Sequence, residues 1–467
     1  MAEANHDFDQ WRQAYHLMPK RGWLNDPNGA VYFKGTYHVY HQYVPDNPKG
    51  GATHWGHKTS KDLVHFKEEP VFLSPGKCFD KDGVYSGGAM KLGDQIHFFY
   101  TGNVKKEGDY DYLYNGRDQN VVHVVSSDGY SIDQRHVVIP HEDFPPGFTS
   151  HIRDPKVFQH GNLFYMILGG RKLDNTGAVL LFESEDLDHW DYKGNLLEGN
   201  EDQGYMWEAP DLVEFGDQAV LLFSPQGIRA NHNSFLNPHS AGYLVGRMDW
   251  DKLKFIPEGP IKELDQGFDF YAPHTFTDGY RTIMWAWMGV SDSSPEYIYP
   301  TVNRGWQHCL TMPRLLELKG DRLLQKPLQE YENIRTNRLE IQNTKKIAYG
   351  DIVGHSYEFD LDFVDQPSHF TLDLLEDTRL AYKEGTLTLN HGPSGYGRRS
   401  RQLDLDSISH LQIFVDHSSL EIFVNHGEAV FSSRVFPGTK DNKMVFDSDT
   451  AANLLYWVLE LSEWWGK

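Results

Sequence analysis

The sequence predicts an all-β protein, made of a five-bladed β-propeller followed by a C-terminal β-sandwich. Three observations support this fold class. One strand pattern occurs five times in the first 320 residues, its copies begin about 55 to 68 residues apart, and the last third of the chain carries a different strand pattern with little sign of helix. We expect a propeller catalytic domain over residues 1–320, a linker over 321–337 and the sandwich over 338–467.

Each copy of the repeat has a turn with glycine, followed by an apolar or alternating run rich in β-branched and aromatic residues, which is typical of a strand. The turn glycines are Gly35, Gly93, Gly161, Gly216 and Gly279. A second short strand precedes each run, and these strands read DPNGAVYF, SGGAMKL, DPKVFQH, APDLVEF and APHTFTD. Five such hairpin units favour propeller blades; a run of hairpins in a large β-sandwich is the alternative.

The preceding strands share a proline or glycine at a matched position. It lies six residues before the turn glycine in four copies, at Gly87, Pro155, Pro210 and Pro273. In the first copy Pro27 lies eight residues before Gly35, which predicts a hairpin two residues longer.

The pattern changes after residue 320. The segment DRLLQKPLQEYENIR predicts a connecting strand and a short helical linker. Strict alternation from Glu340 onward, as in HSYEFDLDF and HLQIFVDHSSLEIFVNHG, predicts the second all-β domain. Its acidic residues Asp416 and Glu421 are expected to serve the hairpin or contacts between domains rather than catalysis.

The charge balance excludes some partners. The chain of 467 residues has 44 Lys and Arg against 66 Asp and Glu, a formal net charge of −22. Such a surface repels phosphate backbones and anionic lipids, so we expect neither nucleic acid nor a membrane as partner. The N-terminal segment lacks the basic start and apolar core of a secretory signal, so a cytoplasmic protein is expected, as a monomer or homodimer.

Signatures of cofactor and metal chemistry are absent from the sequence. Cys78 and Cys309 cannot form a disulfide framework and are expected to be free, buried thiols. There is no Cys pair or HExxH spacing for zinc, and no P-loop, GxSxG elbow or GxGxxG fingerprint. We therefore expect no metal and no cofactor.

Three acidic residues lie at matched places in the repeat. Asp26, Asp154 and Glu208 lie at the starts of the predicted innermost strands, whose like ends meet at one mouth of a propeller channel. Clustered carboxylates repel, so at least one should have a raised pKa, as a general acid requires. Two carboxylates across a scissile bond suit glycoside hydrolysis. The alternatives are turn or cap residues and a cation site, although the sequence has no DxDxDG-like calcium loop.

Aromatic residues make up 14% of the chain, and several of them are expected to lie near these acids in the propeller. They can stack on a sugar ring, or they can belong to a β-core rich in aromatic residues, and composition does not separate the two. The candidates are Trp23, Trp55, Tyr85, Trp207, Tyr271 and Trp287.

The motifs around the acids resemble those of glycoside hydrolase family 32, the invertase and fructan hydrolase family. WLNDPNG at 23–29, RDP at 153–155 and WEAPDL at 207–212 resemble its three acidic motifs, in order. YSGGAM at 85–90, the HWGHKTSKDLVHF segment and LQIFVDHSSLEIFVNHGEAVFSSRVFP in the second domain extend the likeness to nearly the whole chain. The family fold, a five-bladed propeller joined to a β-sandwich, agrees with the repeat.

The resemblance implies a retaining β-fructofuranosidase without a cofactor. Asp26 would be the nucleophile, Glu208 the acid and then the base, and Asp154 would hold fructose hydroxyls and stabilise the transition state. A retaining mechanism requires the two reacting carboxyl groups to lie about 5–5.5 Å apart. The implied substrate-binding residues comprise hydrogen-bonding groups and aromatic walls: Asn25, Gln42, Ser86, Arg153, Trp55, Tyr85, Tyr271 and Trp287.

Two positions depart from the family pattern. Ala209 follows the acid where the family usually has Cys, and YSGGA lacks the second Ser that is frequent in the family. Neither change removes a reacting group.

The segment YPTVNRGWQHCLTMPRLLEL resembles the bacterial intracellular branch of the family, the sucrose-6-phosphate hydrolases. A sugar phosphate would need a basic group at the pocket rim, and the sequence does not indicate which residue that is. Free sucrose and short fructo-oligosaccharides remain alternative substrates, a fructosyltransferase is an alternative activity, and a non-catalytic fructan-binding protein is the alternative from another class.

Overall fold

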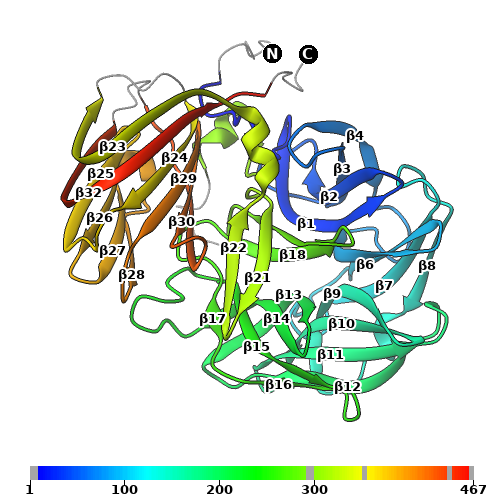
Figure 1. Cartoon of the computed structure of the whole chain (residues 1–467). Helices are drawn as coiled ribbons and strands as arrows, with labels where there is room; N and C mark the ends of the chain where they lie inside the picture. Colours follow the sequence, from blue (N-terminus) through cyan, green and yellow to red (C-terminus); the bar gives the residue numbers. More distant parts are fainter. Residues whose placement is uncertain (1–8, 291–298, 350–354, 439–443, 462–467) are drawn as a thin grey trace.

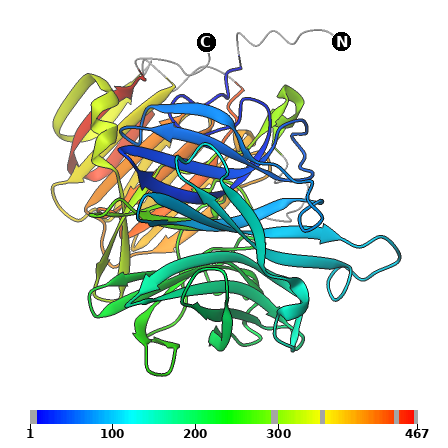
Figure 2. The ribbon, with the colours of Figure 1, turned by 90° about the vertical axis from the view of Figure 1, so that its right-hand side faces the viewer.

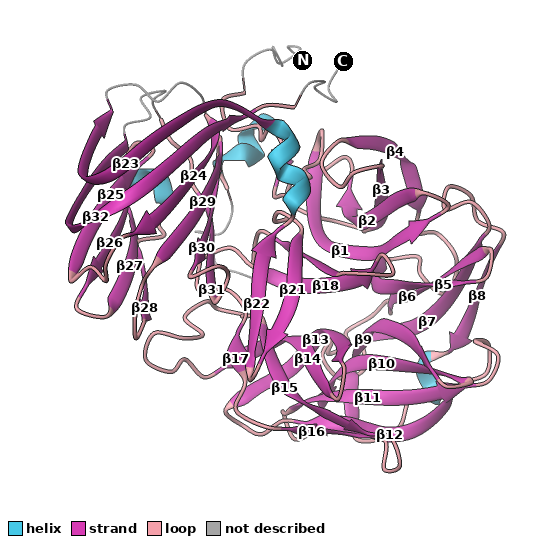
Figure 3. Ribbon diagram, viewed as in Figure 1, coloured by secondary structure: helices cyan, strands magenta, loops and turns pink. Residues whose placement is uncertain are grey.

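The computed structural model describes residues 9–290, 299–349, 355–438 and 444–461. Regular structure in these ranges is almost entirely β-strand (Figure 3). Five sheets arranged around an axis form a propeller, and a second all-β body packs beside them (Figure 1). The turned view looks onto the propeller, with the sandwich behind it (Figure 2). This arrangement confirms the predicted fold class.

Each blade is a sheet of four consecutive antiparallel strands, with small additions in blades 1 and 4. Blade 1 contains β1 (Gly22–Phe33), β2 (Thr36–Val44), β3 (His54–Ser60) and β4 (Phe66–Leu73). Blade 2 contains β5 (Val84–Leu92), β6 (Gln95–Lys105), β7 (Arg117–Ser126) and β8 (Gln134–Ile139). Blade 3 contains β9 (Phe148–His160), β10 (Leu163–Lys172), β11 (Gly177–Ser184) and β12 (Asp191–Glu198).

Blade 4 contains β13 (Gln203–Phe215), β14 (Gln218–Ile228), β15 (Gly242–Asp249) and β16 (Lys254–Pro257), with β17 (Lys262–Glu263) also paired to β15. Blade 5 contains β18 (Tyr271–Thr277), β19 (Thr282–Trp287), β21 (Arg314–Lys319) and β22 (Arg322–Pro327). Strand β20 (Trp306–Gln307) pairs in parallel with the start of β1, which joins the segment between β19 and β21 to blade 1.

The first two strands of every blade are the hairpin predicted by the repeat, and each hairpin has a bulge at the matched position. Two residues of the first strand lie opposite one residue of the second at 25–26, 85–86, 154–155, 209–210 and 272–273. Proline is tolerated at a bulge because the missing N–H leaves no ladder bond unmade. The matched proline or glycine of the repeat therefore lies in a bulge, or directly after one, on every innermost strand.

The first hairpin is longer for two separate reasons. Strand β1 has a second bulge between Asn28 and Val31, which adds one residue. In addition, Gly35 is the second residue of its turn, after Lys34, whereas Gly161 is the first residue of the turn between His160 and Leu163. The two offsets together account for the two extra residues.

The boundary between the domains lies further along the chain than predicted. Strand β22 falls in the expected linker, but it pairs along its whole length with β21 and completes blade 5. The linker is reduced to the 3-10 helix η5 (Gln329–Ile334), and β23 of the second domain begins at Arg335. The predicted connecting strand and helical turn are both present, but the strand belongs to the propeller and the second domain begins three residues earlier than predicted.

The second domain is a curled antiparallel sheet that encloses its own core as a β-sandwich. Its strands are β23 (Arg335–Tyr349), β24 (Ser356–Phe363), β25 (His369–Leu374), β26 (Thr378–Lys383), β27 (Thr386–His391), β28 (Ser400–Asp404), β29 (His410–Asp416), β30 (Ser419–Val424), β31 (Ala429–Arg434) and β32 (Met444–Leu459). The long strand β32 pairs first with β25 and then with β24, so it joins the two halves of the sandwich.

Helices are few and short. The remaining 3-10 helices are η2 (His141–Asp143), η4 (Pro300–Arg304) and η6 (Pro393–Gly395). Within the described ranges, no helix has the length and apolar character needed to cross a bilayer. Cys78 and Cys309 are free, as expected; Cys309 is buried, but Cys78 is exposed.

Candidate active site

The three predicted acids come together at the bulges of the innermost strands. Asp26 lies in the bulge of β1, Asp154 in that of β9, and Glu208 directly precedes that of β13. Asp154 and its neighbour at the matched position, Ala209, have φ values of 65° and 46°. Left-handed backbone is unfavourable for residues other than glycine, and at these two positions it accompanies the bulge. A bulge re-aims side chains out of the regular pleat, here toward the channel mouth.

Asp26 is held by two side chains from blades 1 and 2. The Ser86 hydroxyl donates to Asp26 Oδ2 at 2.5 Å, and the Asn25 amide donates to Oδ1 at 3.1 Å. Gln42 ties these two donors together, because its amide donates to Ser86 Oγ and its carbonyl oxygen accepts from Asn25 Nδ2. The Trp23 indole donates to Asn25 Oδ1 at 2.9 Å. The carboxylate is therefore oriented by a closed set of hydrogen bonds.

Glu208 has a different set of partners. Arg153 donates to Glu208 Oε1 from Nε at 2.9 Å and from Nη2 at 2.5 Å. Gln226 and Tyr271 donate to Oε2 at 2.8 and 2.5 Å. Both oxygens are thus engaged, and the side chain retains 14% of its exposure.

Asp154 is the most enclosed of the three acids, with 7% of its surface exposed. Its Oδ2 accepts a hydrogen bond of 2.9 Å from the backbone N–H of Ala209, and its own backbone N–H donates to Thr101 Oγ1 at 2.9 Å. The contact from residue 209 comes from the backbone. The alanine that replaces the usual cysteine therefore leaves the hydrogen bond to Asp154 intact.

The electrostatics of the cluster bear out the expectation of a raised pKa and place it on the two aspartates. Burial, opposed by the Ser86 hydrogen bond and reinforced by the charge of Glu208, raises the pKa of Asp26 to about 6. Burial and the Glu208 charge raise the pKa of Asp154 to about 7 against the pull of Arg153. For Glu208, burial acts upward, but the charge and hydrogen bonds of Arg153, with the Tyr271 bond, bring its pKa below the ordinary value.

The aromatic residues predicted to form the pocket walls differ in their exposure and contacts. Trp55 has no exposed surface; it packs on Tyr40, and its indole donates to the Tyr85 carbonyl at 3.0 Å. The expectation that Trp55 forms a wall is therefore corrected to a supporting role behind Tyr85, since a ring enclosed in the core presents no face to a ligand. Tyr271 is 2% exposed and is a hydrogen-bond partner of Glu208.

Trp287 is also enclosed and packs against Trp23 and Tyr271, with ring centroids 5.8 and 6.3 Å apart. Trp23 and Tyr85 are half-buried, so they keep surface that a ligand can contact. Trp207 is buried against Phe223 in the core of blades 3 and 4. Most of the aromatic content therefore belongs to the core, and part of it supports the site.

The channel below the carboxylates is narrow. A small cavity there is lined by the bulge residues and by Asn28, Lys156 and His274. Lys156 donates to Asp211 Oδ2 at 3.0 Å and to the Thr275 carbonyl, which links blades 3, 4 and 5 across the axis. This contact fixes the strands on which the acids lie.

A basic cluster lies beside Arg153. The Nη1 of Arg153 lies 2.6 Å from His151 Nδ1. Burial and the charges of Arg153, Arg117 and Arg171 lower the pKa of His151 to about 2, so His151 is neutral between three arginines. Arg171 stacks over the Tyr205 ring at 4.2 Å and donates to the neutral Asn175 side chain. Among the described residues, no carboxylate lies within ion-pair distance of Arg171.

Several residues of the site were not identified from the sequence. Gln226, His151 and Thr101 contact the reacting groups or their partners. For Thr101 the sequence held a weak signal: it lies in the predicted strand after Gly93, and in the structure it is opposite the bulge of blade 2. No pattern in the sequence indicated Gln226. Its position near Glu208 depends on the register of β13 against β14, which the bulge at 209–210 shifts.

Comparison with known proteins gives a consistent result over the whole chain. Residues 16–327 match the family model described as Glycosyl hydrolases family 32 N-terminal domain, and residues 321–461 match Glycosyl hydrolases family 32 C terminal. The chain is 39% identical over 440 residues to the sucrose-6-phosphate hydrolase of Bacillus subtilis (strain 168), an alignment that covers 92% of this chain and 90% of that protein.

Two solved structures extend the comparison to the fold. The sucrose-6-phosphate hydrolase from Lactobacillus gasseri has a TM-score of 0.87 and 29% identity, with 98% of each chain covered. A β-fructofuranosidase mutant from Bombyx mori in complex with sucrose has a TM-score of 0.83 and 28% identity, with 97% of this chain and 94% of that chain covered.

Proposed function

Since the chain belongs to glycoside hydrolase family 32 and is a β-fructofuranosidase-type hydrolase, we propose that its preferred substrate is sucrose 6-phosphate, which it cleaves to fructose and glucose 6-phosphate. The observation that carries the choice of substrate is the basic cluster beside the acid. The charges of Arg117 and Arg171 act on His151, and His151 contacts Arg153 of the Arg153–Glu208 pair, on a chain whose net charge is −22.

The position of the cluster fits a phosphate on the leaving sugar. The leaving oxygen belongs to glucose and must lie next to the acid, so the glucose unit extends outward past Glu208. We place the phosphate beside Arg117 and Arg171, whose charges act on His151 next to Arg153. Arginine suits phosphate because its planar group donates two parallel hydrogen bonds. A charged disaccharide does not cross a bilayer unaided, so this substrate fits a cytoplasmic enzyme that acts after a phosphorylating importer.

The proposed reaction follows the retaining scheme with two carboxylates. Asp26 attacks the anomeric carbon of fructose while Glu208 gives its proton to the leaving glucosyl oxygen, which breaks the glycosidic bond and forms a fructosyl ester on Asp26. Glu208 then takes a proton from water, whose oxygen attacks the same carbon and releases Asp26. Asp154 accepts hydrogen bonds from fructose hydroxyls, for which its position beside both groups is suited.

The Arg153 contact must weaken before Glu208 can act as an acid. In the free site Arg153 keeps the pKa of Glu208 low. We propose that fructose hydroxyls draw the Arg153 guanidinium away, so that substrate binding itself raises the pKa of the acid. Proton donation is then coupled to occupancy of the pocket.

The test is kcat/KM on sucrose 6-phosphate and on sucrose for the wild type and Arg171→Ala. We expect the wild type to prefer the phosphorylated sugar at least tenfold, which is about 1.4 kcal/mol of transition-state binding. Arg171→Ala should lose most of that preference through KM, with little change on sucrose, because only the phosphate contact is removed.

Lys172→Ala is the matched control. Lys172 is the neighbouring cation but is already paired with Glu198 at 2.7 Å. Its loss should leave the ratio of kcat/KM on sucrose 6-phosphate to kcat/KM on sucrose unchanged. Equal wild-type rates on the two sugars, or an unchanged ratio in Arg171→Ala, would contradict the proposed phosphate contact.

A further inference from the structure

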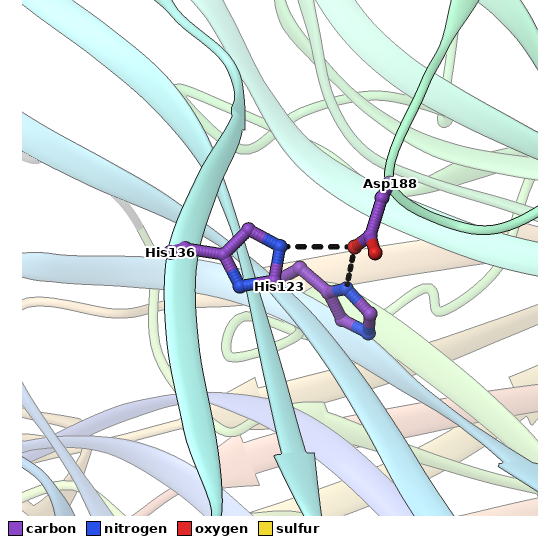
Figure 4. Close-up of side chains that lie close together, drawn as sticks. All are labelled: His123, His136 and Asp188. Atoms are coloured by element: carbon purple, nitrogen blue, oxygen red, sulfur yellow. Dashed lines mark hydrogen bonds and ion pairs between the residues drawn. The ribbon is translucent and has the colours of Figure 1, made fainter.

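Two histidines and an aspartate far apart in the sequence meet on the outside of the propeller, between blades 2 and 3 (Figure 4). His123 on β7 and His136 on β8 are directly opposite in the antiparallel ladder. Asp188 reaches them from the turn between β11 and β12. Its Oδ1 lies 2.9 Å from His123 Nδ1 and 2.9 Å from His136 Nε2, and all three ligand atoms lie within 4.8 Å of one another.

The most buried ligand is supported from behind. His123 is 3% exposed, its ring stacks on Phe99 at 4.5 Å, and its Nε2 lies 2.9 Å from Nδ1 of His97 on β6. A histidine that binds a metal through one nitrogen usually donates the other N–H to a fixed acceptor. His97 is placed to accept that proton at Nδ1, which leaves the lone pair of His123 Nδ1 directed at Asp188.

The charge of Asp188 has no permanent partner. Its ion-pair contacts among the described residues are the two histidines alone, with no lysine or arginine. A chain of hydrogen bonds from His97 through His123 to Asp188 would satisfy the same atoms with neutral rings. Each neutral ring can instead carry its proton on the nitrogen that faces away from Asp188. His123 Nδ1 and His136 Nε2 then present lone pairs, and a divalent cation can take the place of the two protons.

We propose that His123 Nδ1, His136 Nε2 and Asp188 Oδ1 form a binding site for one divalent transition-metal ion of the zinc, cobalt or nickel class. Two imidazoles and one carboxylate are the donor set that such borderline ions prefer, and water would occupy the positions that the protein leaves open. The partial exposure of His136 and Asp188, at 42% and 48%, allows the ion to enter from solvent.

The consequence is a cross-link between neighbouring blades. His123 and His136 belong to blade 2 and Asp188 to blade 3, so an ion bound by all three resists their separation. The sequence contains no zinc spacing and predicted no metal, because the ligands come from two strands and a distant turn. The site lies apart from the carboxylates, and the proposal does not depend on the proposed substrate.

Titration of the chelator-treated, full-length chain with Zn²⁺ alone tests the proposal by calorimetry. We expect one site that is lost in Asp188→Asn and in His136→Ala, both of which change exposed side chains and should leave the fold intact. Co²⁺ in place of Zn²⁺ should give visible d–d absorption in the wild type, and this absorption should be lost in both variants. Bound Zn²⁺ should also raise the melting temperature of the wild type, since an ion that binds only the folded state stabilises it.

His189→Ala is the matched control. His189 lies on the same turn, is exposed, and pairs with Asp186 rather than with the cluster. It should bind Zn²⁺ like the wild type. Zinc binding that is unchanged in Asp188→Asn, or that is lost only when the separate Asp360, Asp362 and His410 cluster is altered by His410→Ala, would overturn the proposal, as would no binding at all.

Discussion

At the scale of single residues, the two proposed reacting carboxylates differ in their neighbours. Asp26 is half-buried, its hydrogen bonds come from the neutral groups of Ser86 and Asn25, and the charge of Glu208 acts on it unfavourably. For Glu208 burial also acts upward, but the charge and hydrogen bonds of Arg153 and the hydrogen bond of Tyr271 together bring its pKa below the ordinary value. The different partners of the two acids therefore move their pKa values in opposite directions, and the Arg153 cation is the largest of the contributions that lower the pKa of Glu208.

Asp26→Asn should abolish turnover and yet stabilise the fold at neutral pH. The pKa of Asp26 is raised from 3.8 to about 6, so the folded state binds the proton more tightly than the unfolded state. The ionised carboxylate therefore costs stability above pH 6, and that cost disappears as the pH falls toward 4. We expect the variant to exceed the wild type by about 1–3 kcal/mol at pH 8, with a difference that shrinks as the pH falls below 6.

Urea unfolding at several pH values measures this difference, and Asp46→Asn is the control. Asp46 is a surface aspartate with 80% of its side chain exposed, so its variant should show no comparable trend. Appreciable turnover by Asp26→Asn would contradict the assignment of the nucleophile. A stability difference independent of pH would contradict the raised pKa.

Arg153→Lys should move the alkaline limb of the pH profile of kcat/KM. Lysine keeps the charge but cannot donate twice to Glu208 Oε1, so its hold on the carboxylate is weaker and the pKa of Glu208 should rise. If Glu208 is the acid, the alkaline limb then shifts to higher pH, while kcat falls because a pocket contact is lost. An alkaline limb that stays in place would show that another group supplies the proton.

At the scale of elements, the bulge is the device that builds the site. The five innermost strands each carry one, and the residues in or beside them include Asn25, Asp26, Ser86, Asp154 and Glu208. In a regular strand, neighbouring side chains point to opposite faces. The bulge breaks that alternation at one level of the channel, so side chains from different blades converge there.

Gly169→Ala should damage the site through the backbone. Gly169 pairs with Arg153, and a Cβ at this position would lie 1.9 Å from the Trp207 carbonyl oxygen and 3.4 Å from the Glu208 Cα. Backbone atoms cannot move aside as a side chain can, so β13 must shift and carry Glu208 with it. We expect a loss of about 1–3 kcal/mol in stability and roughly 10²-fold in kcat/KM.

Gly259→Ala is the control for this substitution. A Cβ at Gly259 meets nothing within 4 Å. Its variant should match the wild type in urea unfolding and in kinetics. Full activity in Gly169→Ala would mean that the strand spacing at the acid is not critical.

At the scale of the whole molecule, a buried ionic network joins the domains. Arg314 of blade 5 is fully buried and donates to Asp265 at 3.0 Å and to Glu421 of the sandwich at 2.6 Å. Asp416 accepts hydrogen bonds from three backbone N–H groups of residues 14–16. This confirms the prediction that Asp416 and Glu421 serve contacts rather than catalysis, and it orients the sandwich against the propeller.

Arg314→Met should destabilise the protein strongly. The substitution leaves Asp265 buried without a cation and leaves Glu421 with His16 as its basic partner, which costs about 3–5 kcal/mol. Calorimetry should show a lower melting temperature, and the two domains should unfold less cooperatively. Arg322→Ala is the control: it removes an exposed bond of 3.3 Å to Glu428 across the same junction, worth at most about 1 kcal/mol. Equal melting temperatures for the two variants would contradict a structural role for the buried network.

Much of the architecture was predictable because it follows from local chemistry. Turn glycines and alternating strands indicated every blade hairpin, and the matched prolines marked the bulges on which the acids lie. The boundary after blade 5 was not predictable, since β22 belongs to the propeller only through its pairing with β21. The buried position of Trp55 was not predictable either, because an aromatic residue in a strand suits a core or a pocket equally.

The five-fold repeat, the two all-β domains and the family could be predicted from the amino-acid sequence alone, and the three acids could be singled out, because turn formation, side-chain alternation and motif spacing are properties of neighbouring residues. The folded structure was needed to show that Arg153 helps to lower the pKa of Glu208 and that Gln226 and Tyr271 hold this side chain. It was also needed to show that basic residues gather near Arg153 and that His123, His136 and Asp188 meet. These contacts join residues from different blades or depend on strand register, and both are set when the sheets close around the axis.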